Sequence, residues 1–489
     1  MIETKFGPIQ GTVQDGVTCY KGIPFAVPPV GELRFMPPRD PAAWQEVLDC
    51  SAFRPSAIQV AKKDEGIAFD EDCLYLNIWA PEDAVGKSLP VLVFIHGGAY
   101  TQGSPAKSLY DGTRFAKDGI IQVNISYRLN ALGFLGFPEV AEKYGNVGNC
   151  GTLDQIKALQ WVQDNIAAFG GDAGNVTISG ESAGSFSVSN LLMSPLAKGL
   201  FQRAIMESGN LLGQPVIVPL ASGDVGQALE CAASFTQSLG GQTLADMQQM
   251  DAMALAEASL FSVDITNPAP YSFWPAFDGH VLPKEPYKAL VAGENNGVDI
   301  MAGYNTDEGS MFVPEGITEE AYINMVANIF GEGYEEVLQR YPVDAEHTAT
   351  DRARDIFLYG IRLGSEAFAD EFSRQGNNVY YYNFDLEMPL LDEMGMGTAH
   401  AMELFFVFDN IPPTIQLDEA KLAFKEDLHN RWLNFIVSGN PNTGVPVGPQ
   451  WPLYTPEGRE ILVLNADTTA GTLQNTDDTK FLFDWFWKD

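Results

Sequence analysis

The sequence is poor in histidine, cysteine and basic residues. Its 489 residues include only 5 His, 5 Cys and 29 Lys plus Arg, against 64 Asp plus Glu, which gives a formal net charge of -35. Such an acidic surface repels nucleic acid and anionic membranes, so we expect neither as a partner. The cysteines are odd in number and form no C-x-x-C pair. The sequence therefore indicates neither a disulfide framework nor a zinc site.

Long apolar runs are also missing. No run approaches the roughly 18 residues of a membrane span, and the N-terminal stretch MIETKFGPIQGTV lacks the basic flank and apolar core of a signal peptide. We therefore expect a cytoplasmic protein that does not act on membranes. The composition, 45% hydrophobic, 11% aromatic and 19% charged, is typical of a globular enzyme.

Several short apolar runs end in glycine or polar residues and predict strands. Runs of this length without apolar-polar alternation are typical of strands buried on both faces, as in a parallel sheet. They are residues 89–98, 120–127, 176–181, 203–209 and 298–305. Helical patterns lie between them, such as the one that ends at Gly170-Gly171. This alternation predicts an α/β fold with a mostly parallel central sheet and helices on both faces.

The chain has no internal repeat, low-complexity block or long linker that would mark a domain boundary. We therefore expect a single domain over residues 1–489. The pattern is less regular from about residue 213 to residue 374, where we expect cap insertions around a site.

The stretch TISGESAGS, residues 177–185, contains a G-x-S-x-G motif centred on Ser182. It follows an apolar strand and precedes a helix-compatible segment, which is the setting of a nucleophile elbow. In such a sharp turn a side chain at either glycine would collide with the neighbouring strand or helix, which explains Gly180 and Gly184. We expect Ser182 to have a strained backbone and to expose its hydroxyl at a helix N-terminus.

A serine hydroxyl is a weak nucleophile, so it needs a base, an orienting acid and oxyanion donors. In this architecture the acid and then the histidine follow the serine in the chain, which removes His96 as the base. We expect surface roles for His347, in a polar segment, and for His429, in an amphipathic helix. His280 lies in what reads as a hairpin turn. His400 ends a glycine-rich loop before an apolar segment, as expected of a base carried above a sheet.

The acid is expected at a strand end between the serine and the histidine. Asp307 and Glu308 follow the strand at residues 298–305, and on chemistry alone either could orient the histidine.

Oxyanion donors are expected where backbone N–H groups can approach a substrate oxygen without obstruction. The stretch FIHGGAY ends a strand in the small residues Gly97, Gly98 and Ala99. The N–H of Ala183, the residue after the nucleophile, is a further candidate donor.

Taken together, these motifs resemble the type-B carboxylesterase family, which includes bacterial para-nitrobenzyl esterases. FGGDAGNVTISGESAG, residues 169–184, is similar to the family's nucleophile signature, and EDCLYLNIW, residues 71–79, to its second signature. Further matching pieces extend over essentially the whole chain. The resemblance implies an α/β-hydrolase fold.

The resemblance also implies roles for individual residues. The family's catalytic acid is a glutamate directly before a glycine, which selects Glu308 over Asp307 and implies a triad of Ser182, Glu308 and His400.

Two more residues resemble supporting residues beside the family's triad. Glu181 is implied to act electrostatically, although a purely local hydrogen-bonding role is equally open, and Ser208 is a weaker candidate.

Two structural ion pairs and a free thiol follow from the same resemblance. The pairs join Arg34 to Glu71 and Arg128 to Asp172. Secreted relatives often pair the cysteine that corresponds to Cys73, but the partner position here carries an alanine, so we expect a free thiol.

Our main hypothesis is a serine carboxylesterase that hydrolyses small to medium, fairly apolar esters without a cofactor or a metal. The expected partner is the small-molecule ester alone, and the expected state is a monomer or weak homo-oligomer. A non-catalytic adhesion or binding protein on the same fold is one alternative, although such relatives usually lose the nucleophile. A lipase is another, disfavoured by the lack of an evident amphipathic lid. Aromatic residues expected to line the gorge are Phe25, Tyr100, Phe273, Trp274, Phe312 and Phe405.

Overall fold

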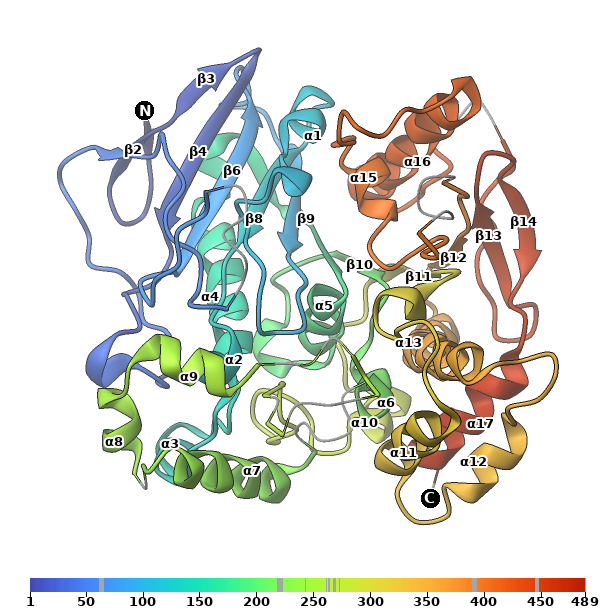
Figure 1. The fold of residues 1–489 in the computed structure, drawn as a ribbon. Helices are drawn as coiled ribbons and strands as arrows, with labels where there is room; N and C mark the ends of the chain where they lie inside the picture. The colour runs from blue at the N-terminus through green and yellow to red at the C-terminus, as the bar shows by residue number, and fades with distance from the viewer. Residues whose placement is uncertain are drawn as a thin grey trace.

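A large mixed sheet runs through the molecule (Figure 1). The computed structural model describes residues 1–60, 66–217, 223–241, 243–260, 262, 264–266, 270–271, 273–388, 394–444 and 448–488. The strands of the large sheet are β3 (Thr12–Gln14), β4 (Val17–Pro24), β6 (Tyr75–Pro81), β7 (Leu89–Ile95), β8 (Ile121–Ile125), β9 (Gly171–Glu181), β10 (Arg203–Glu207), β11 (Asp299–Asn305), β12 (Val379–Phe384), β13 (Glu460–Leu464) and β14 (Thr469–Thr472). A small second sheet contains β1 (Ile2–Glu3), β2 (Pro8–Gln10) and β5 (Leu48–Asp49).

The middle of the large sheet is parallel, as the sequence predicts. The strand order is β14-β13-β12-β11-β10-β9-β7-β8-β6-β4-β3. All neighbours from β13 to β8 pair in parallel, whereas β6, β4, β3 and β14 pair antiparallel with their neighbours. The five strands expected from apolar runs are β7, β8, β9, β10 and β11.

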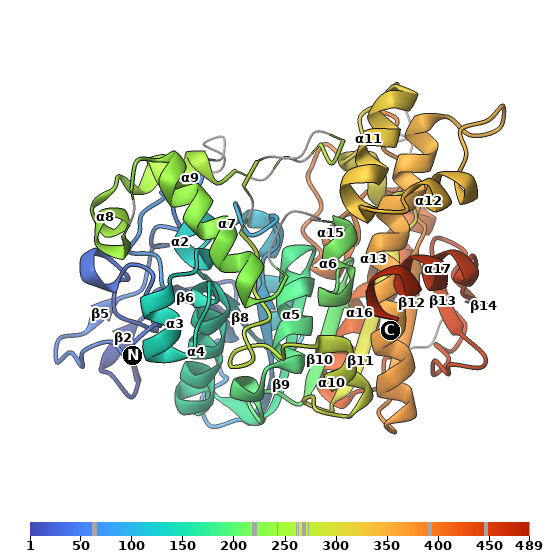
Figure 2. The same cartoon turned by 90° about the horizontal axis from the view of Figure 1, so that it is seen from below.

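Helices cover both faces of this sheet. They are α1 (Thr113–Lys117), α2 (Asn130–Phe134), α3 (Pro138–Tyr144), α4 (Cys150–Asn165), α5 (Ala183–Met193), α6 (Gln214–Ile217), α7 (Val225–Ser238), α8 (Leu244–Gln249), α9 (Ala252–Ala258), α10 (Pro286–Val291), α11 (Glu319–Phe330), α12 (Glu335–Arg340), α13 (Ala349–Arg374), α15 (Glu403–Val407), α16 (Glu419–Ser438) and α17 (Thr476–Trp487). In both views α7, α8 and α9 lie towards the N-terminal strands and α11 and α12 towards the C-terminal strands (Figure 1, Figure 2). In the described part of the chain, no helix is long and apolar enough to cross a membrane.

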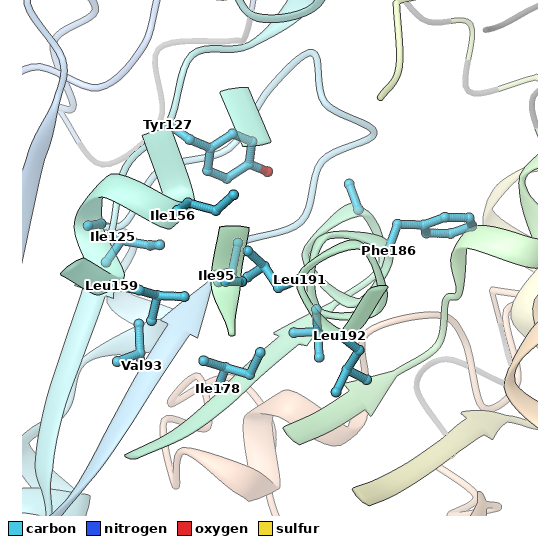
Figure 3. Packing of buried hydrophobic residues seen from close by; sticks show 14 of the residues in the cluster. Val93, Ile95, Ile125, Tyr127, Ile156, Leu159, Ile178, Phe186, Leu191 and Leu192 are labelled. Carbon is cyan, nitrogen blue, oxygen red and sulfur yellow. The ribbon is translucent and has the colours of Figure 1, made fainter. Parts of the chain in front are cut away.

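Successive residues of the central strands point alternately into two hydrophobic clusters, one on each face of the sheet. Val93 and Ile95 of β7 pack in the cluster that holds α4 and α5, with Leu159 and Leu191 (Figure 3). Phe94, between them, belongs to the cluster formed with α15 and α16 on the other face. Burial on both faces explains why these strands are apolar throughout instead of alternating.

The chain reverses its direction across the sheet between β7 and β9. After β7 it continues to β8 on one side, and after β9 it continues to β10 on the other. At such a switch point the crossovers leave a crevice beyond the carboxyl ends of the strands. Ile95 of β7 pairs with Gly180 of β9, so the segments that follow the two strands lie next to each other at this switch point.

Two buried arginines fix loops to this framework. Arg34 forms a two-point pair with Glu71, at 2.7 and 2.6 Å, as the resemblance implies. The second implied pair is wrong, because Arg128 binds Asp154 of α4, at 2.8 and 2.7 Å, and not Asp172. Arg128 follows the carboxyl end of β8, whereas Asp172 lies at the opposite end of β9. Nine residues of strand separate Asp172 from that end, or about 30 Å.

The prediction for the Cys73 thiol is confirmed. Cys73 is buried and free of any disulfide. Its burial raises the pKa of the thiol well above the ordinary value, so the group stays neutral.

Candidate active site

Ser182 lies between the last residue of β9 and the first residue of α5, in a strained turn. Its φ of 55° and ψ of -125° are unusual for a residue other than glycine. A Cβ on Gly180 would lie 2.4 Å from the carbonyl carbon of Gly184, and a Cβ on Gly184 would lie 2.0 Å from the carbonyl oxygen of Ile95. Side chains do not fit at either position, which confirms the steric reason expected for both glycines.

His400 and Glu308 meet on the same side of the sheet. The Nδ1–H of His400 donates a hydrogen bond to Oε2 of Glu308, and both side chains are buried. The backbone N–H of Asn305, at the end of β11, donates to the other oxygen of Glu308 at 2.8 Å. Asp307 faces away and accepts a hydrogen bond from the N–H of Thr398 at 2.7 Å. Of the two carboxylates left open by the residues alone, the structure therefore brings Glu308 to the histidine.

Glu181 lies on the opposite side of the same imidazole. Its Oε1 is 2.9 Å from Nε2 of His400, although the two atoms are not aligned as a hydrogen bond. In the part of the chain that the structure describes, no hydrogen bond joins Nε2 to the Ser182 hydroxyl. Burial disfavours the imidazolium, but the carboxylates of Glu181 and Glu308 outweigh it and hold the pKa of His400 well above its ordinary value.

The other histidines occupy different surroundings. His96 is buried beside the ring of Tyr127, and burial lowers its pKa to about 4, so it stays neutral. His347 lies at the surface, as expected, with its side chain 39% exposed, and contacts Asp344. The prediction of a surface role for His429 is wrong. This residue is fully buried, because α16 packs between the sheet and α15.

The backbone after β7, where the sequence reasoning expects oxyanion donors, runs beside the serine turn. Gly98 and Ala99 have φ of 111° and 54° and turn the chain sharply. A Cβ on Gly97 would lie 3.0 Å from Cβ of Ser182, so this loop runs directly beside the elbow. Among the described residues, the N–H groups of Gly97, Gly98, Ala99 and Ala183 have no acceptor. Their role as oxyanion donors stays a prediction.

Ser208 and the aromatic residues expected to line the gorge lie in different parts of the structure. The Ser208 hydroxyl is buried and, within the described ranges, makes no hydrogen bond to the triad residues. The ring of Phe312 lies edge-on to the His400 imidazole, 5.1 Å away, and Tyr100 and Trp274 pack against each other in the buried core. Phe405 lines a separate surface groove with Phe53 and other residues.

Two buried glutamates beside the site were missed by the sequence reasoning. Glu207 ends β10 as Glu181 ends β9, and each is followed by a serine with positive φ. Glu403 begins α15, three residues after His400. The sequence does contain Glu-Ser at the ends of both strands. Only the pairing of β10 with β9 shows that the two glutamates lie next to each other.

The fold, the strained serine and the buried histidine–glutamate pair together define a class of hydrolase. The model of the carboxylesterase family matches residues 1–482. The chain belongs to this family, is a carboxylic ester hydrolase, and has the α/β-hydrolase fold that the resemblance implies.

Individual relatives extend over nearly the whole chain. It is 36% identical to the para-nitrobenzyl esterase of Bacillus subtilis (strain 168), an alignment that covers 99% of this chain and 98% of that protein. It is 33% identical to the crystal protein of Dictyostelium discoideum, over 98% of this chain and 89% of that one. Among solved structures, a PNB esterase (33% identical, 98% and 99% covered) and a carboxylesterase of Geobacillus stearothermophilus (33% identical, 99% of both covered) each superpose with a TM-score of 0.83.

Proposed function

We propose that the protein hydrolyses small to medium, fairly apolar carboxylic esters through an acyl-enzyme on Ser182. The observation that carries this proposal is the strained serine at the end of β9 beside a histidine that is hydrogen-bonded to a buried glutamate. In this proposal Ser182 is the nucleophile, His400 the base and Glu308 the group that orients His400.

The reaction begins with attack of the Ser182 Oγ on the ester carbonyl carbon, while Nε2 of His400 takes the hydroxyl proton. In this proposal Nε2 reaches the Ser182 hydroxyl while Glu181, the residue before Ser182, stays close to the imidazole. In this proposal the N–H groups of Gly98 and Ala183, which have no acceptor among the described residues, bind the carbonyl oxygen as negative charge develops on it. Glu308 holds the proton on Nδ1 and stabilises the imidazolium.

Collapse of the tetrahedral intermediate breaks the bond to the alcohol, which leaves with the proton from Nε2. A water molecule then gives a proton to Nε2 and attacks the acyl carbon. The second collapse returns that proton to Ser182 Oγ and releases the carboxylic acid. The cycle needs neither a cofactor nor a metal, and the ester is the only partner that we propose. We also propose a monomer or weak homo-oligomer in the cytoplasm.

Hydrolysis of a para-nitrophenyl ester by Ser182→Ala tests this proposal. We expect turnover to fall to the uncatalysed background while the thermal unfolding temperature stays within a few degrees of the wild-type value. Ser185→Ala is a matched control, because Ser185 lies in the first turn of α5, close to Ser182, but donates to the carbonyl oxygen of Gly209. Activity retained in Ser182→Ala would refute the assignment of the nucleophile.

Two further measurements separate the alternatives. A fluorophosphonate probe labels an activated serine, so a binding or adhesion protein would remain unlabelled. A series of para-nitrophenyl esters of increasing acyl length gives the size of the acyl site, and a jump in activity above the solubility limit would indicate a lipase.

A further inference from the structure

Four buried glutamates gather around His400, and the proposed reaction uses only part of this set. They are Glu181, Glu207, Glu308 and Glu403, none more than 3% exposed. In the described part of the chain, the only cation within ion-pair distance of any of them is His400 itself. One imidazole cannot balance four buried negative charges, and an unpaired buried carboxylate is costly. Some of these side chains must therefore keep a proton.

Strand pairing places Glu207 next to Glu181. The two residues are direct partners in the parallel pair of β9 and β10, so their side chains leave the same face of the sheet. Paired backbones on adjacent strands lie about 4.8 Å apart. The same row continues through Gly303 to Tyr382. A Cβ on Gly303 would lie 2.3 Å from the Tyr382 ring, so the missing side chain leaves room for the ring to lie over the row.

The hydrogen bonds of each carboxyl group indicate which one is charged. Glu308 accepts from the backbone N–H of Asn305 and from His400, and two donors stabilise an anion. Glu181 faces Nε2 of His400. Glu403 accepts from the Asn305 side chain at 2.6 Å, and burial together with the other glutamates raises its pKa well above the ordinary value.

Glu207 is poorly placed to carry a negative charge. Its Oε1 accepts one hydrogen bond, from the Ser179 hydroxyl at 2.7 Å, and within the described ranges its Oε2 is buried without a partner. The Trp432 indole N–H lies close enough to Glu207 to favour its charged form, although the two groups do not form a hydrogen bond. Burial, reinforced by the Glu181 carboxylate, raises the pKa of Glu207 to about 8, against the opposing effect of Ser179. A proton on Oε2 turns this unpaired acceptor into a donor.

We propose that Glu207 is a positioning residue of the esterase reaction, held as a neutral carboxylic acid that donates from Oε2 to the carboxylate of Glu181. This role rests on the proposed function, because Glu207 acts on His400 only through Glu181. The hydrogen bond keeps the Glu181 carboxylate near the His400 imidazole and weakens the attraction of that carboxylate for the proton of His400. An ionised Glu207 would instead add a second negative charge and leave less of the free base.

The pH dependence of kcat/KM in three variants tests the role. Glutamine at position 207 is neutral and keeps a donor, so Glu207→Gln should leave the acid limb within about 0.3 pH unit of wild type, whereas Glu181→Gln should lower it by about 1 unit. Glu207→Met has a similar size but no donor. It should lower kcat about tenfold with little change in KM and move the acid limb to higher pH. A downward shift in Glu207→Gln like that of Glu181→Gln, or equal profiles for the Gln and Met variants, would overturn the proposal.

Infrared difference spectroscopy reads the proton without turnover. The wild-type spectrum minus that of Glu207→Gln at pH 7 should contain the carbonyl stretch of a neutral carboxylic acid, which disappears with a midpoint near pH 8. Ser179→Ala removes the donor that favours the anion, so it should move this midpoint upward. Absence of the acid signal at pH 7 would refute the inference even in an active esterase. Absence of ester hydrolysis in the wild type would instead refute the proposed function.

Discussion

Replacement of Glu308 by glutamine should reverse the tautomer of His400. The backbone N–H of Asn305 points at one oxygen of Glu308 at 2.8 Å, and His400 Nδ1–H points at the other. In Glu308→Gln the amide oxygen must face the Asn305 N–H, so the amide NH2 faces Nδ1. Nδ1 then becomes an acceptor and the ring proton moves to Nε2, where it prevents His400 from taking the proton of Ser182.

The expected loss of kcat is large, because His400 must take a proton from Ser182 in every turnover. The corresponding change in a serine protease triad lowers kcat by about 10⁴, equivalent to about 5 kcal/mol of transition-state stabilisation. Steady-state hydrolysis of para-nitrophenyl acetate measures the effect, and thermal unfolding checks the fold. Asp307→Asn is the matched control: an asparagine oxygen can still accept from the Thr398 N–H, so activity should stay within about threefold of wild type. A Glu308→Gln enzyme within tenfold of wild type, or equal losses in both variants, would refute this reasoning.

Three further predictions concern the turn, a buried ion pair and pH. Gly184→Ala should destabilise the protein and lower its unfolding temperature, because the new Cβ would lie 2.0 Å from the Ile95 carbonyl oxygen; an unchanged temperature would contradict the crowding. Arg128→Met should cost about 3–5 kcal/mol in urea unfolding by leaving Asp154 buried without its partner, and a second change of Asp154 to leucine should restore most of that loss. The acid limb of kcat/KM should lie above pH 6.5, because the carboxylates that raise the pKa of His400 keep it protonated at lower pH; a limb below that value would contradict the geometry.

Local steric demands made the elbow predictable from the sequence. Gly180 is required by its contact with Gly184 inside the motif, and Gly184 by its contact with Ile95 of the neighbouring strand, and a sharp turn at the end of a buried strand predicts both contacts. The central strands were equally predictable, because a strand that is buried on both faces appears in the sequence as a continuous run of apolar residues. The selection of Glu308 over Asp307 was different: chemistry allowed both, and the resemblance to the family decided it.

Long-range placement explains what the sequence could not give. Arg128 has several carboxylates at plausible positions in the chain, and only the direction of β8 and β9 separates the partner at Asp154 from the distant Asp172. His429 has the spacing of a polar helix face, but α16 is covered on that face too. Glu207 became visible only through its register with Glu181, which no local pattern encodes.

The close packing of the elbow against β7 separates the proposed catalytic groups into two parts. The backbone at Gly184 lies against that of Ile95, shortly before Gly98 and Ala99, so the proposed nucleophile and the proposed oxyanion donors depend on one packed contact between α5 and β7. The proposed base, His400, is carried by a separate loop. On warming, we therefore expect the loop that carries His400 to unfold locally before the serine turn does. The rate of ester hydrolysis should then fall at temperatures where the serine turn is still folded.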